Sequence, residues 1–426
     1  MNQTIQIALL GAGTVGGGVY KLLEKRRSEL PQRVGADIQI SAVLVRNVSR
    51  PRPGIDPVVL TDDWQSIVRN PDIKIVVELM GGIEPARTYI REALQAGKNV
   101  VTANKDLIAE HGAELFDLAE ANHCDLQFEA AVAGAIPIIR PLKQCLAGNE
   151  LTEIMGIVNG TTNYILTRMT QDGMEFDEAL AKATELGYAE ADPTADIEGY
   201  DAGRKVAIMA SVGFHSRVRF SDVVCEGITS ITATDIRFAR EMGCTIKLLG
   251  VARNTPDGIE ARVHPMLIPQ SHPLATVNDA FNAVFVHGDA LDDAMFYGRG
   301  AGEFPTASAV VGDIIDTCRN LLMGCTARIG CTCFKELPVK PAAEIDSKFF
   351  VRMKVDHRLG VLAGVTSVFG NTGVSIAQMV QHQTTDGCAE LVVITDAVRE
   401  KHFDDALTIL CSMSMVREIC SVIRVY

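Results

Sequence analysis

Two lysines occupy positions from which an ammonium group could take part in a reaction. The segment KNVVTANKD, residues 98–106, places Lys105 directly after a strand-like apolar run. Lys205 precedes a second apolar run, VAIMASV, and Asp201 lies four residues earlier, on the same face if the segment is helical. An exposed pair of this kind contributes only ~0.3 to 0.5 kcal/mol. We expect a buried helix and a buried Lys205, and a buried lysine needs carboxylate partners or a role in proton transfer.

Acidic side chains gather just before Lys205, in the segment ELGYAEADPTADIEGYDAGRK. Glu190, Asp192 and Asp196 flank Pro193, which predicts a loop. Two interpretations of this loop remain open. The carboxylates could hold a substrate ammonium while the lysine handles a carbonyl or hydroxyl proton, or they could form an acidic cap at the start of the following helix.

A glycine-rich turn near the amino terminus indicates a cofactor site. The predicted strand IQIALLGAG runs into Gly11, Gly13 and Gly16, a G-x-G-x-x-G that opens a predicted helix and includes Thr14 and Val15. The first glycine permits a tight turn, the second lets backbone amides approach a pyrophosphate, and the third allows close helix packing. In this strand-turn-helix context the motif predicts dinucleotide binding.

The residues after the next strand-like run bear on the choice of cofactor. IQISAVLV ends at Arg46, where folds that select NAD often carry an acidic residue. Arg46, with Arg50 nearby, could instead contact the 2′-phosphate of NADP. We therefore expect NADP, with NAD possible, and the alternative is a solvated basic loop.

The composition excludes some classes of partner and predicts a location. The chain carries 53 acidic and 40 basic residues, a formal net charge of -13, which disfavours nucleic acid and anionic membrane surfaces. Its apolar runs stay shorter than the roughly 18 residues of a membrane span, and its amino terminus lacks a signal-peptide pattern. The 11 cysteines, an odd number, suggest a reduced, cytoplasmic protein. The spacing of one cysteine group lacks the C-x-x-C pairs of common zinc sites, so we expect unligated thiols at Cys318, Cys325, Cys331 and Cys333.

Strand-like and helix-like patterns divide the 426 residues into parts. Residues 1–130 alternate short apolar runs with amphipathic stretches, which predicts an α/β fold, a Rossmann-type doubly wound parallel sheet whose last strand covers 124–132. Residues 131–335 mix both patterns and predict an α+β domain that supplies the substrate site; its roles in catalysis and dimerisation are implied only by the family resemblance given below. Residues 336–348 are interpreted as a linker, and 349–426 show a βαββαβ order.

Several segments together resemble homoserine dehydrogenase, in the form that carries a C-terminal ACT domain. The acidic block that ends in a lysine is the most specific of them, whereas the glycine turn is shared with many oxidoreductases. The segments are GAGTVGGGV, VTANKDLIA, FEAAVAGAIPII, GIVNGTTNYIL, ELGYAEADPTADIEGYDAGRKVAIMA and GRGAGEFPTASAVVGDI. The resemblance implies an NAD(P)-dependent interconversion of L-homoserine and L-aspartate 4-semialdehyde, in the aspartate route to threonine, methionine and isoleucine.

The same resemblance implies roles for single residues. Lys205 would give a proton to the aldehyde oxygen, and Lys105 would lie beside the nicotinamide and the substrate. The implied substrate-binding residues are Glu190, Asp201, Asp196, Tyr188, Gly160 and Thr161. The implied cofactor contacts, besides the glycine turn and Arg46, are Thr102, Lys105, Gly187 and Gly302.

The family pattern also implies a bound ion and an effector. A monovalent cation, Na⁺ or K⁺, would lie at Glu129, Val132, Gly134 and Ile136, held by backbone carbonyls and one carboxylate. L-threonine would bind the ACT domain at the turns 356–360 and 371–373, and the alternative is an assembly module that binds nothing. The resemblance implies a homodimer or homotetramer.

Two rival functions stay open from the sequence. One is another NAD(P)-dependent dehydrogenase of a small amino or hydroxy acid. The other is a non-catalytic sensor that binds NADPH in its first domain and an amino acid in its last. The sensor has no need for the two lysines and the carboxylates between them, which favours an enzyme.

Overall fold

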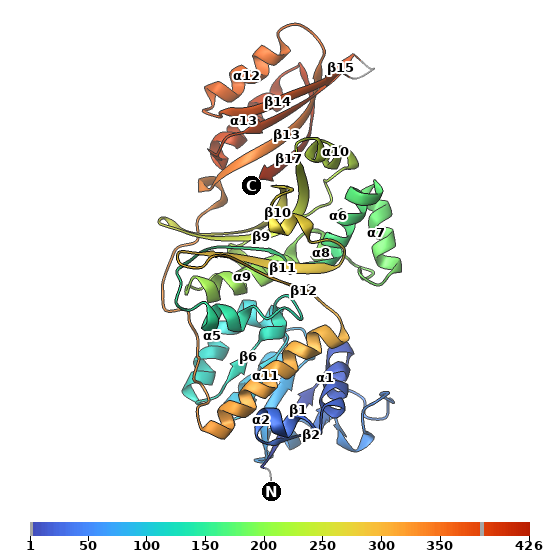
Figure 1. Ribbon diagram of the computed structural model, residues 1–426, viewed down its shortest axis with the longest axis vertical. Coiled ribbons are helices and arrows are strands. Elements are labelled where there is room, and N and C mark those ends of the chain that lie inside the picture. The colour runs from blue at the N-terminus through green and yellow to red at the C-terminus, as the bar shows by residue number, and fades with distance from the viewer. Residues whose placement is uncertain (1–2, 384–386) are drawn as a thin grey trace. The chain divides into compact units, whose positions relative to one another are not determined.

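The structure is a computed structural model that describes residues 3–383 and 387–426 (Figure 1). The chain forms two compact units, and each is made from several separate segments. Unit 1 comprises Met1–Ile154, Arg204–Val223 and Phe281–Leu337. Unit 2 comprises Met155–Gly203, Val224–Ala280 and Pro338–Tyr426. The domain boundaries expected from the sequence stay predictions.

Unit 1 is built on a parallel sheet. Its strands lie in the order β3-β2-β1-β4-β5-β6, and every neighbouring pair runs parallel. This is the strand order of a doubly wound dinucleotide-binding fold, so the predicted N-terminal fold is confirmed. The strands are β1 (Thr4–Leu10), β2 (Asp37–Leu44), β3 (Leu60–Thr61), β4 (Ile73–Glu78), β5 (Asn99–Thr102) and β6 (Leu126–Gln127).

The strand predicted over residues 124–132 is wrong in its length, because β6 ends at Gln127. The chain turns instead into a 3-10 helix, Glu129–Ala131. The Glu129 carboxylate accepts hydrogen bonds from the backbone N–H groups of residues 138–140. These contacts fold the chain back on itself at the point where a longer strand would continue.

Helices cover both faces of this sheet, and successive β1 side chains point to opposite faces. Ile7 and Leu9 pack against one group of helices, whereas Ala8 and Leu10 pack against the other. The first group is α1 (Thr14–Lys25), α2 (Leu30–Val34) and α11 (Glu303–Met323). The second is α3 (Trp64–Val68), α4 (Ala86–Gln95) and α5 (Lys105–Ala121).

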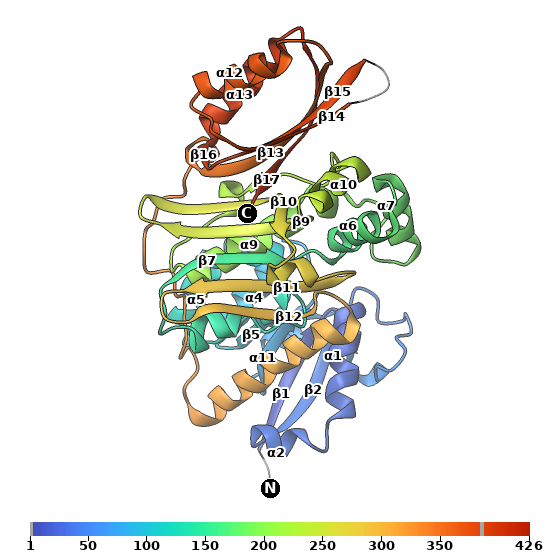
Figure 2. The same cartoon turned by 45° about the horizontal axis from the view of Figure 1, so that its top comes forward.

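Helix α11 returns from late in the sequence to lie along α1, orange beside blue in Figures 1 and 2. Gly18 of α1 permits this close approach, because a Cβ there would stand 2.8 Å from the backbone oxygen of Glu303. Next to it, Lys21 Nζ forms an ion pair of 2.8 Å with Glu303 Oε1. Packing between distant segments therefore completes the first core.

The remaining elements of unit 1 are shorter or lead into unit 2. The strands β11 and β12 form an antiparallel pair. The helix α9 and the strand β7 each run from one unit into the other. The bounds are β7 (Leu151–Ile157), α9 (Tyr200–Gly213), β11 (Phe281–Gly288), β12 (Asp292–Arg299), a π-helix (Pro141–Cys145) and the 3-10 helices Pro57–Val59 and Phe220–Asp222.

Unit 2 holds a mixed sheet, as predicted for the middle of the chain. Its strands follow the order β9-β10-β17-β13-β15-β14, in which β10 and β17 run parallel and the other neighbours antiparallel. Helices α6, α7, α8 and α10 belong to the same unit. The bounds are α6 (Gly160–Asp172), α7 (Phe176–Glu185), α8 (Thr194–Ile197), β8 (Val224–Cys225), α10 (Ala233–Glu241), β9 (Cys244–Thr255), β10 (Gly258–Pro269) and a 3-10 helix (Pro273–Thr276).

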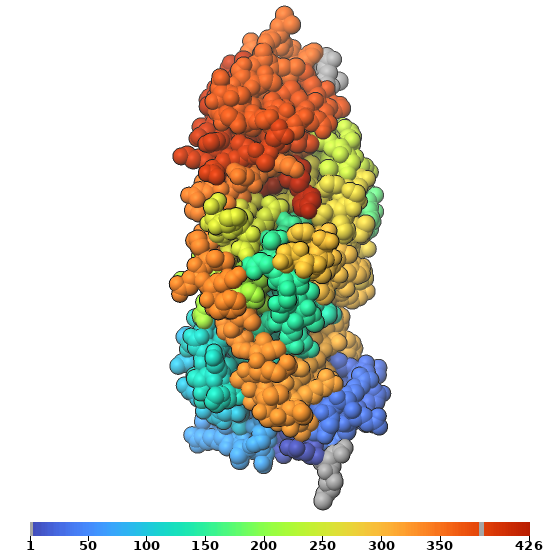
Figure 3. Space-filling model, turned by 60° about the vertical axis from the view of Figure 1, so that its left-hand side comes forward, coloured from blue at the N-terminus to red at the C-terminus, as the bar shows by residue number. Residues whose placement is uncertain are grey.

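The C-terminal segment confirms the predicted βαββαβ order. Its atoms, orange to red, pack as one group in the space-filling view of Figure 3. Phe349, Phe369 and Phe403 belong to its buried core. The elements are β13 (Asp346–Asp356), α12 (Val361–Asn371), β14 (Ile376–Gln383), β15 (Cys388–Thr395), a short β16 (Val398–Arg399), α13 (Glu400–Ser412) and β17 (Val416–Val425), after the 3-10 helix Ala342–Glu344.

The segment interpreted as a linker makes strand-like contacts. Lys335 forms an isolated β-bridge with Ser216, and Val339 forms one with Ile259. Ile345 is buried. In the described part of the chain, helices fall short of the length and apolarity needed to cross a membrane.

Candidate active site

The glycine turn joins β1 to α1 and leaves room for a ligand at one position. Gly11 has φ +103°, and a Cβ there would stand 2.9 Å from the backbone oxygen of Leu79. A Cβ on Gly16 would stand 2.2 Å from the backbone oxygen of Gly11. Gly13, by contrast, faces open space and begins α1 without a side-chain cap, next to exposed Thr14 and half-buried Val15. Backbone amides at such a helix start suit a pyrophosphate.

The basic residues beyond β2 are exposed. Arg46 and Arg50 both point away from the core in the loop that follows β2. Arg52 holds this loop, because its guanidinium donates hydrogen bonds to the carbonyl oxygens of Asn47 at 3.0 Å and of Arg50 at 2.8 Å. Among the described residues, the Arg46 side chain has no hydrogen-bond or ion-pair partner. Its guanidinium is available for a ligand phosphate.

A buried carboxylate ties together the ends of β4 and β5. Glu78 is fully buried, and its Oε2 accepts a hydrogen bond of 2.7 Å from Thr102 Oγ1. The same Thr102 hydroxyl accepts one of 3.0 Å from the backbone N–H of Asn104. Asn104 Oδ1 then caps α5 by accepting the Leu107 N–H at 3.1 Å. These contacts fix the start of α5, where Lys105 is the first helical residue.

The two candidate catalytic lysines come from helices joined by an ion pair. Arg204 Nε lies 2.9 Å from Asp106 Oδ1, so α9 contacts the first turn of α5. Lys105 precedes Asp106 and Lys205 follows Arg204, and both lysines are half-buried. The prediction of a buried Lys205 is therefore corrected. Ala202, Gly203 and Val206 of α9 are buried, whereas residues 204 and 205 between them are half-buried.

In unit 2 one asparagine gathers two of the predicted carboxylates. Asn159 Nδ2 donates hydrogen bonds to Asp196 Oδ1 at 2.6 Å and to Asp201 Oδ2 at 2.9 Å. Its Oδ1 accepts the Thr162 N–H at 2.9 Å and so caps α6. The role of Asn159 is missing from the sequence prediction, although its position before a helical run is typical of a cap.

The predicted residues Gly160, Thr161 and Tyr188 are also brought together, at the start of α6. Gly160 is the first residue of the helix, and Thr161 Oγ1 donates a hydrogen bond of 2.7 Å to the Tyr188 carbonyl oxygen. The Tyr188 ring lies 4.9 Å from the ring of Tyr164. Glu190 lies two residues beyond Tyr188 and is exposed. The acidic loop thus packs beside the amino end of α6, and within it Asp192 Oδ1 accepts the Thr194 N–H at 3.1 Å, so both interpretations of the loop stay open.

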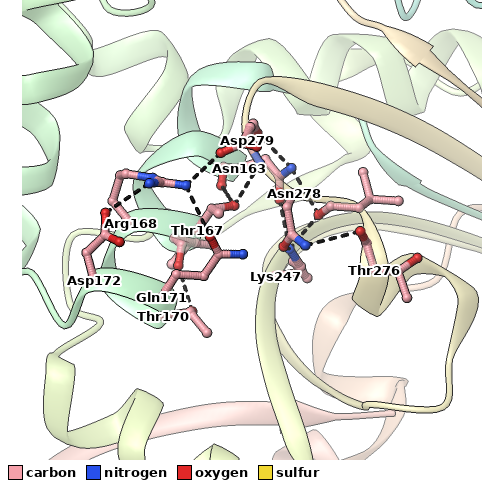
Figure 4. Close-up of polar contacts among 12 residues, drawn as sticks. Asn163, Thr167, Arg168, Thr170, Gln171, Asp172, Lys247, Thr276, Asn278 and Asp279 are labelled. Atoms are coloured by element: carbon pink, nitrogen blue, oxygen red, sulfur yellow. Dashed lines mark hydrogen bonds and ion pairs between the residues drawn. The ribbon is translucent and has the colours of Figure 1, made fainter.

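A polar network further along α6 holds this helix in place (Figure 4). Lys247 of β9 is buried and donates to Val277 O at 2.6 Å, Asn163 Oδ1 at 3.2 Å and Asn278 Oδ1 at 3.2 Å. Burial lowers the pKa of Lys247 to about 8, although the charge of Asp279 opposes the shift. Arg168 of α6 forms an ion pair of 2.7 Å with the Asp279 carboxylate.

The two remaining cofactor candidates are glycines in left-handed conformations. Gly187 of unit 2 has φ +75° and open space around it. Gly302 of unit 1 has φ +125° and precedes α11. Both positions require a residue without a side chain, which agrees with a close approach to a ligand but does not demand one.

The candidate cation stretch offers carbonyls and one carboxylate that is already hydrogen-bonded. The Glu129 carboxylate accepts three backbone N–H groups, at 2.6 to 2.8 Å, and its role as a cation ligand stays a prediction. Ala133 and Gly134 have φ of 55° and 56°, which curls the backbone. Within the described chain, the carbonyl oxygens of Val132, Gly134 and Ile136 accept no hydrogen bond. No cluster of three His, Cys, Asp or Glu side chains suited to a metal occurs in that part either.

Family profiles match three stretches of the chain. The profile "Homoserine dehydrogenase, NAD binding domain" covers residues 11–129, and "Homoserine dehydrogenase" covers residues 137–315. The profile "ACT domain" covers residues 349–413. The first lies within unit 1, the second spans segments of both units up to α11, and the third runs from β13 through α13.

Relatives agree with these profiles over the full length. Homoserine dehydrogenases of Corynebacterium glutamicum and Synechocystis sp. are both 47% identical, over 99% of this chain and 95% and 99% of theirs. A crystal structure of a homoserine dehydrogenase from Thiobacillus denitrificans is 40% identical, with a TM-score of 0.95 over 100% of this chain and 98% of that one. A hyperthermophilic archaeal homoserine dehydrogenase in complex with NADPH is 26% identical, with a TM-score of 0.63 over 74% of this chain and 98% of that one. The chain therefore belongs to the homoserine dehydrogenase family and is an NAD(P)-dependent oxidoreductase with an ACT domain.

Proposed function

We propose that this homoserine dehydrogenase reduces L-aspartate 4-semialdehyde to L-homoserine with NADPH, and that Lys205 protonates the aldehyde oxygen. The observation that carries the assignment of the lysines is the ion pair between Arg204 and Asp106. It joins the start of α5 to α9, so Lys105 and Lys205 stand on helices that meet in the unit that also holds the glycine turn.

The proton transfer follows from the charge that develops during reduction. Bound NADPH supplies a hydride to the aldehyde carbon, and the electron pair of the carbonyl bond moves onto oxygen. The Lys205 ammonium stabilises that oxygen and gives it a proton, and Lys105 adds a second positive charge. The products are the alcohol and NADP⁺, so the electrons balance.

The residues around α6 supply groups for the amino-acid end of the substrate. Asp201 lies one helical turn before Lys205 on α9, and with Asp196 and Glu190 it would bind the substrate ammonium. The α6 amino terminus at Gly160 and Thr161 would bind the carboxylate, because helix starts favour anions. Tyr188 lies beside these residues, because its carbonyl oxygen accepts the hydrogen bond from Thr161.

The preference for NADPH is assigned to Arg46, whose side chain is exposed beyond β2. The archaeal relative in complex with NADPH supports a phosphorylated cofactor. Arg46→Asp should lower the preference for NADPH over NADH by roughly tenfold or more, the value of a lost hydrogen bond to a charged group. The ratio of kcat/KM for the two cofactors measures this preference. An unchanged ratio contradicts the assignment.

A monovalent cation, Na⁺ or K⁺, is assigned to the carbonyls of Val132, Gly134 and Ile136, with the Glu129 carbonyl as a fourth oxygen. The three carbonyls that accept no hydrogen bond in the described chain support this assignment, because buried carbonyls ordinarily have partners. The melting temperature should rise on adding KCl or NaCl but stay unchanged with tetramethylammonium chloride at the same ionic strength.

L-threonine is assigned to a cavity of about 470 Å³ in the ACT domain. The turn 356–363 and Gln381 line this cavity, and the predicted turn 371–373 lies outside its lining. Asp356 Oδ2 forms an ion pair of 3.2 Å with Arg358 Nε. The cavity therefore offers a carboxylate for the ammonium group of an amino acid and a guanidinium for its carboxylate. Asp356→Asn should abolish inhibition by L-threonine, whereas Asp396→Asn outside the cavity should keep it. A wild-type enzyme insensitive to threonine would leave the domain an assembly module.

We expect the enzyme to act as a homodimer or homotetramer in the cytoplasm, where its free cysteines stay reduced. Light scattering of the purified protein measures the assembly state.

The central experiment follows NADPH oxidation with L-aspartate 4-semialdehyde, with L-threonine and KCl as additions. A protein that binds NADPH but never oxidises it would be the non-catalytic sensor.

A further inference from the structure

A cavity of about 320 Å³ in unit 1 lies outside the residues assigned to the reaction. One wall is a face of α5 that includes Ile108, Ala113 and Phe116, and the opposite wall is Val212 of α9. The volume falls in the range of small-molecule pockets, and the lining is mostly apolar. An apolar ligand body of moderate size would therefore be stabilised there.

Lys143 is the charged side chain inside this cavity. It stands on the π-helix Pro141–Cys145, an element that often marks functional sites. Its ammonium lies 5.4 Å from the ring centres of both Phe116 and Phe128. Across the described residues, no carboxylate or carbonyl oxygen lies within hydrogen-bonding distance of it. Burial lowers the pKa of Lys143, as expected for a cation without a hydrogen-bonding anion.

The charges around the cavity favour an anion. Lys143, Arg217 and Arg219 line it, against one acidic lining residue, Glu110, and Arg217 also pairs at 3.3 Å with Asp117 outside the lining. Arg217 and Arg219 are exposed, whereas Lys143 is half-buried. The chain as a whole has a net charge of -13, so the positive charge of this lining is opposite in sign to the net charge of the protein. Such an arrangement attracts an anion and directs it inward.

A pair of thiols faces the same ammonium. Cys331 and Cys333 line the cavity, and their side chains are hydrogen-bonded. The bond from Cys333, with the charges of Arg217 and Lys143, lowers the pKa of Cys331 to about 6. A ligand anion in the cavity would lie near both the Cys331 thiol and the Lys143 ammonium.

We propose that this cavity is a binding site for a small amphipathic monocarboxylate, whose carboxylate pairs with Lys143 and whose apolar body packs between α5, α9 and the two phenylalanine rings. The site is separate from the assigned substrate and threonine sites. It needs one anionic head because the Lys143 ammonium lies inside, and an apolar body because most of the other lining surface is apolar.

Calorimetry of the full chain with octanoate, 1-octanol and octylammonium tests the proposal. Octanoate should bind with one molecule per chain, and at least about tenfold more tightly than the other two probes. Equal affinity for octanol and octanoate would overturn the role of Lys143. Absence of saturable octanoate binding would overturn the proposed site. This outcome would also be seen if another copy of the chain filled the cavity, and it would overturn the proposal in that case too.

Variants locate the binding. Lys143→Met keeps the length of the side chain but removes its charge, and should weaken octanoate binding about tenfold or more. Lys401→Met, an exposed lysine of α13, is the matched control and should bind normally. Ala113→Leu should fill the cavity and abolish binding while leaving Lys143 in place. If Lys143→Met fails to fold, the Ala113→Leu variant and the probe series still decide the question.

The thiol pair gives an independent readout. Octanoate should protect Cys331 from alkylation by iodoacetamide, measured by mass spectrometry, and should leave the exposed Cys411 unprotected. Cys331→Ser should still bind octanoate, because the carboxylate pairs with Lys143 rather than with the thiol. Alkylation of Cys331 at the same rate with and without saturating octanoate would place the ligand elsewhere and overturn the proposal.

Discussion

Lys205 of α9 in unit 1 and Lys247 of β9 in unit 2 are both lysines of interest, but their environments differ. Lys247 is buried and surrounded by three oxygen acceptors, so its ammonium is fully used in holding α6. Lys205 is half-buried at the edge of α9, beside the ion pair of Arg204 with Asp106. The comparison teaches that a lysine enclosed by the fold serves structure, whereas a lysine that stays partly exposed can be reached by a ligand.

The largest expected effect distinguishes the two lysines by activity. Lys205→Ala should lower kcat by ~10² to 10⁴-fold, the usual contribution of a general acid. Its melting temperature should change little, because the side chain is half-buried and contributes little packing. Steady-state kinetics with L-aspartate 4-semialdehyde and thermal melting measure both quantities. Lys182→Ala, a half-buried lysine of α7, serves as the control, and near-normal turnover of Lys205→Ala would remove that residue from the mechanism.

The converse substitution tests the structural lysine by stability. Lys247→Met removes the ammonium and leaves three oxygens without their donor, so the free energy of unfolding should fall by about 1 to 3 kcal/mol. Chemical denaturation measures the change. Asn278→Ala removes one acceptor and should cost less than Lys247→Met. A Lys247→Met protein as stable as the wild type would mean that the network around α6 contributes no net stability.

Local patterns predicted much of this fold. The glycine turn and the βαββαβ order depend on residues adjacent in sequence, and both are confirmed. The strand predicted over 124–132 is too long. It ends early because the Glu129 carboxylate contacts residues 138–140, and such contacts leave no periodic pattern in the sequence. Propensity describes the local chain, whereas such returns of the backbone depend on tertiary structure.

The candidate site divides in the same way. Asn159 and Asn104 are helix caps that a search for Asn before a helical run could have found. The ion pair between Arg204 and Asp106 joins residues far apart in sequence, and nothing in either local pattern indicates the other. Sequence reasoning therefore named the chemical groups, and the structure supplied the contacts that position them.

The pH dependence of the free energy of unfolding tests the environment of Lys247, the structural lysine of the comparison. The pKa of this lysine is lowered to about 8 in the fold, below the ordinary value of 10.5. Between pH 8 and 10.5 the unfolded chain binds more protons than the folded chain, so the contribution of Lys247 to stability rises with pH in this window and is constant below it. The gain is at most about 3 kcal/mol. The wild type measured against Lys247→Met across this range should show the rise, and parallel curves would contradict the shifted pKa.

The smallest expected effect concerns the ion pair that joins α5 to α9. Asp106→Asn keeps the shape of the side chain but removes its charge, and both partners are partly exposed, so stability should change by less than about 1 kcal/mol. If the pair positions the two lysines, kcat should still fall several-fold while KM for NADPH stays constant, because a small misplacement of a reacting group slows chemistry. Arg217→Met removes the ion pair of Arg217, which lies beyond the end of α9, with Asp117 of α5; it is the control and should keep wild-type kcat. Equal kcat in both variants would mean that the helices are held by their apolar faces alone.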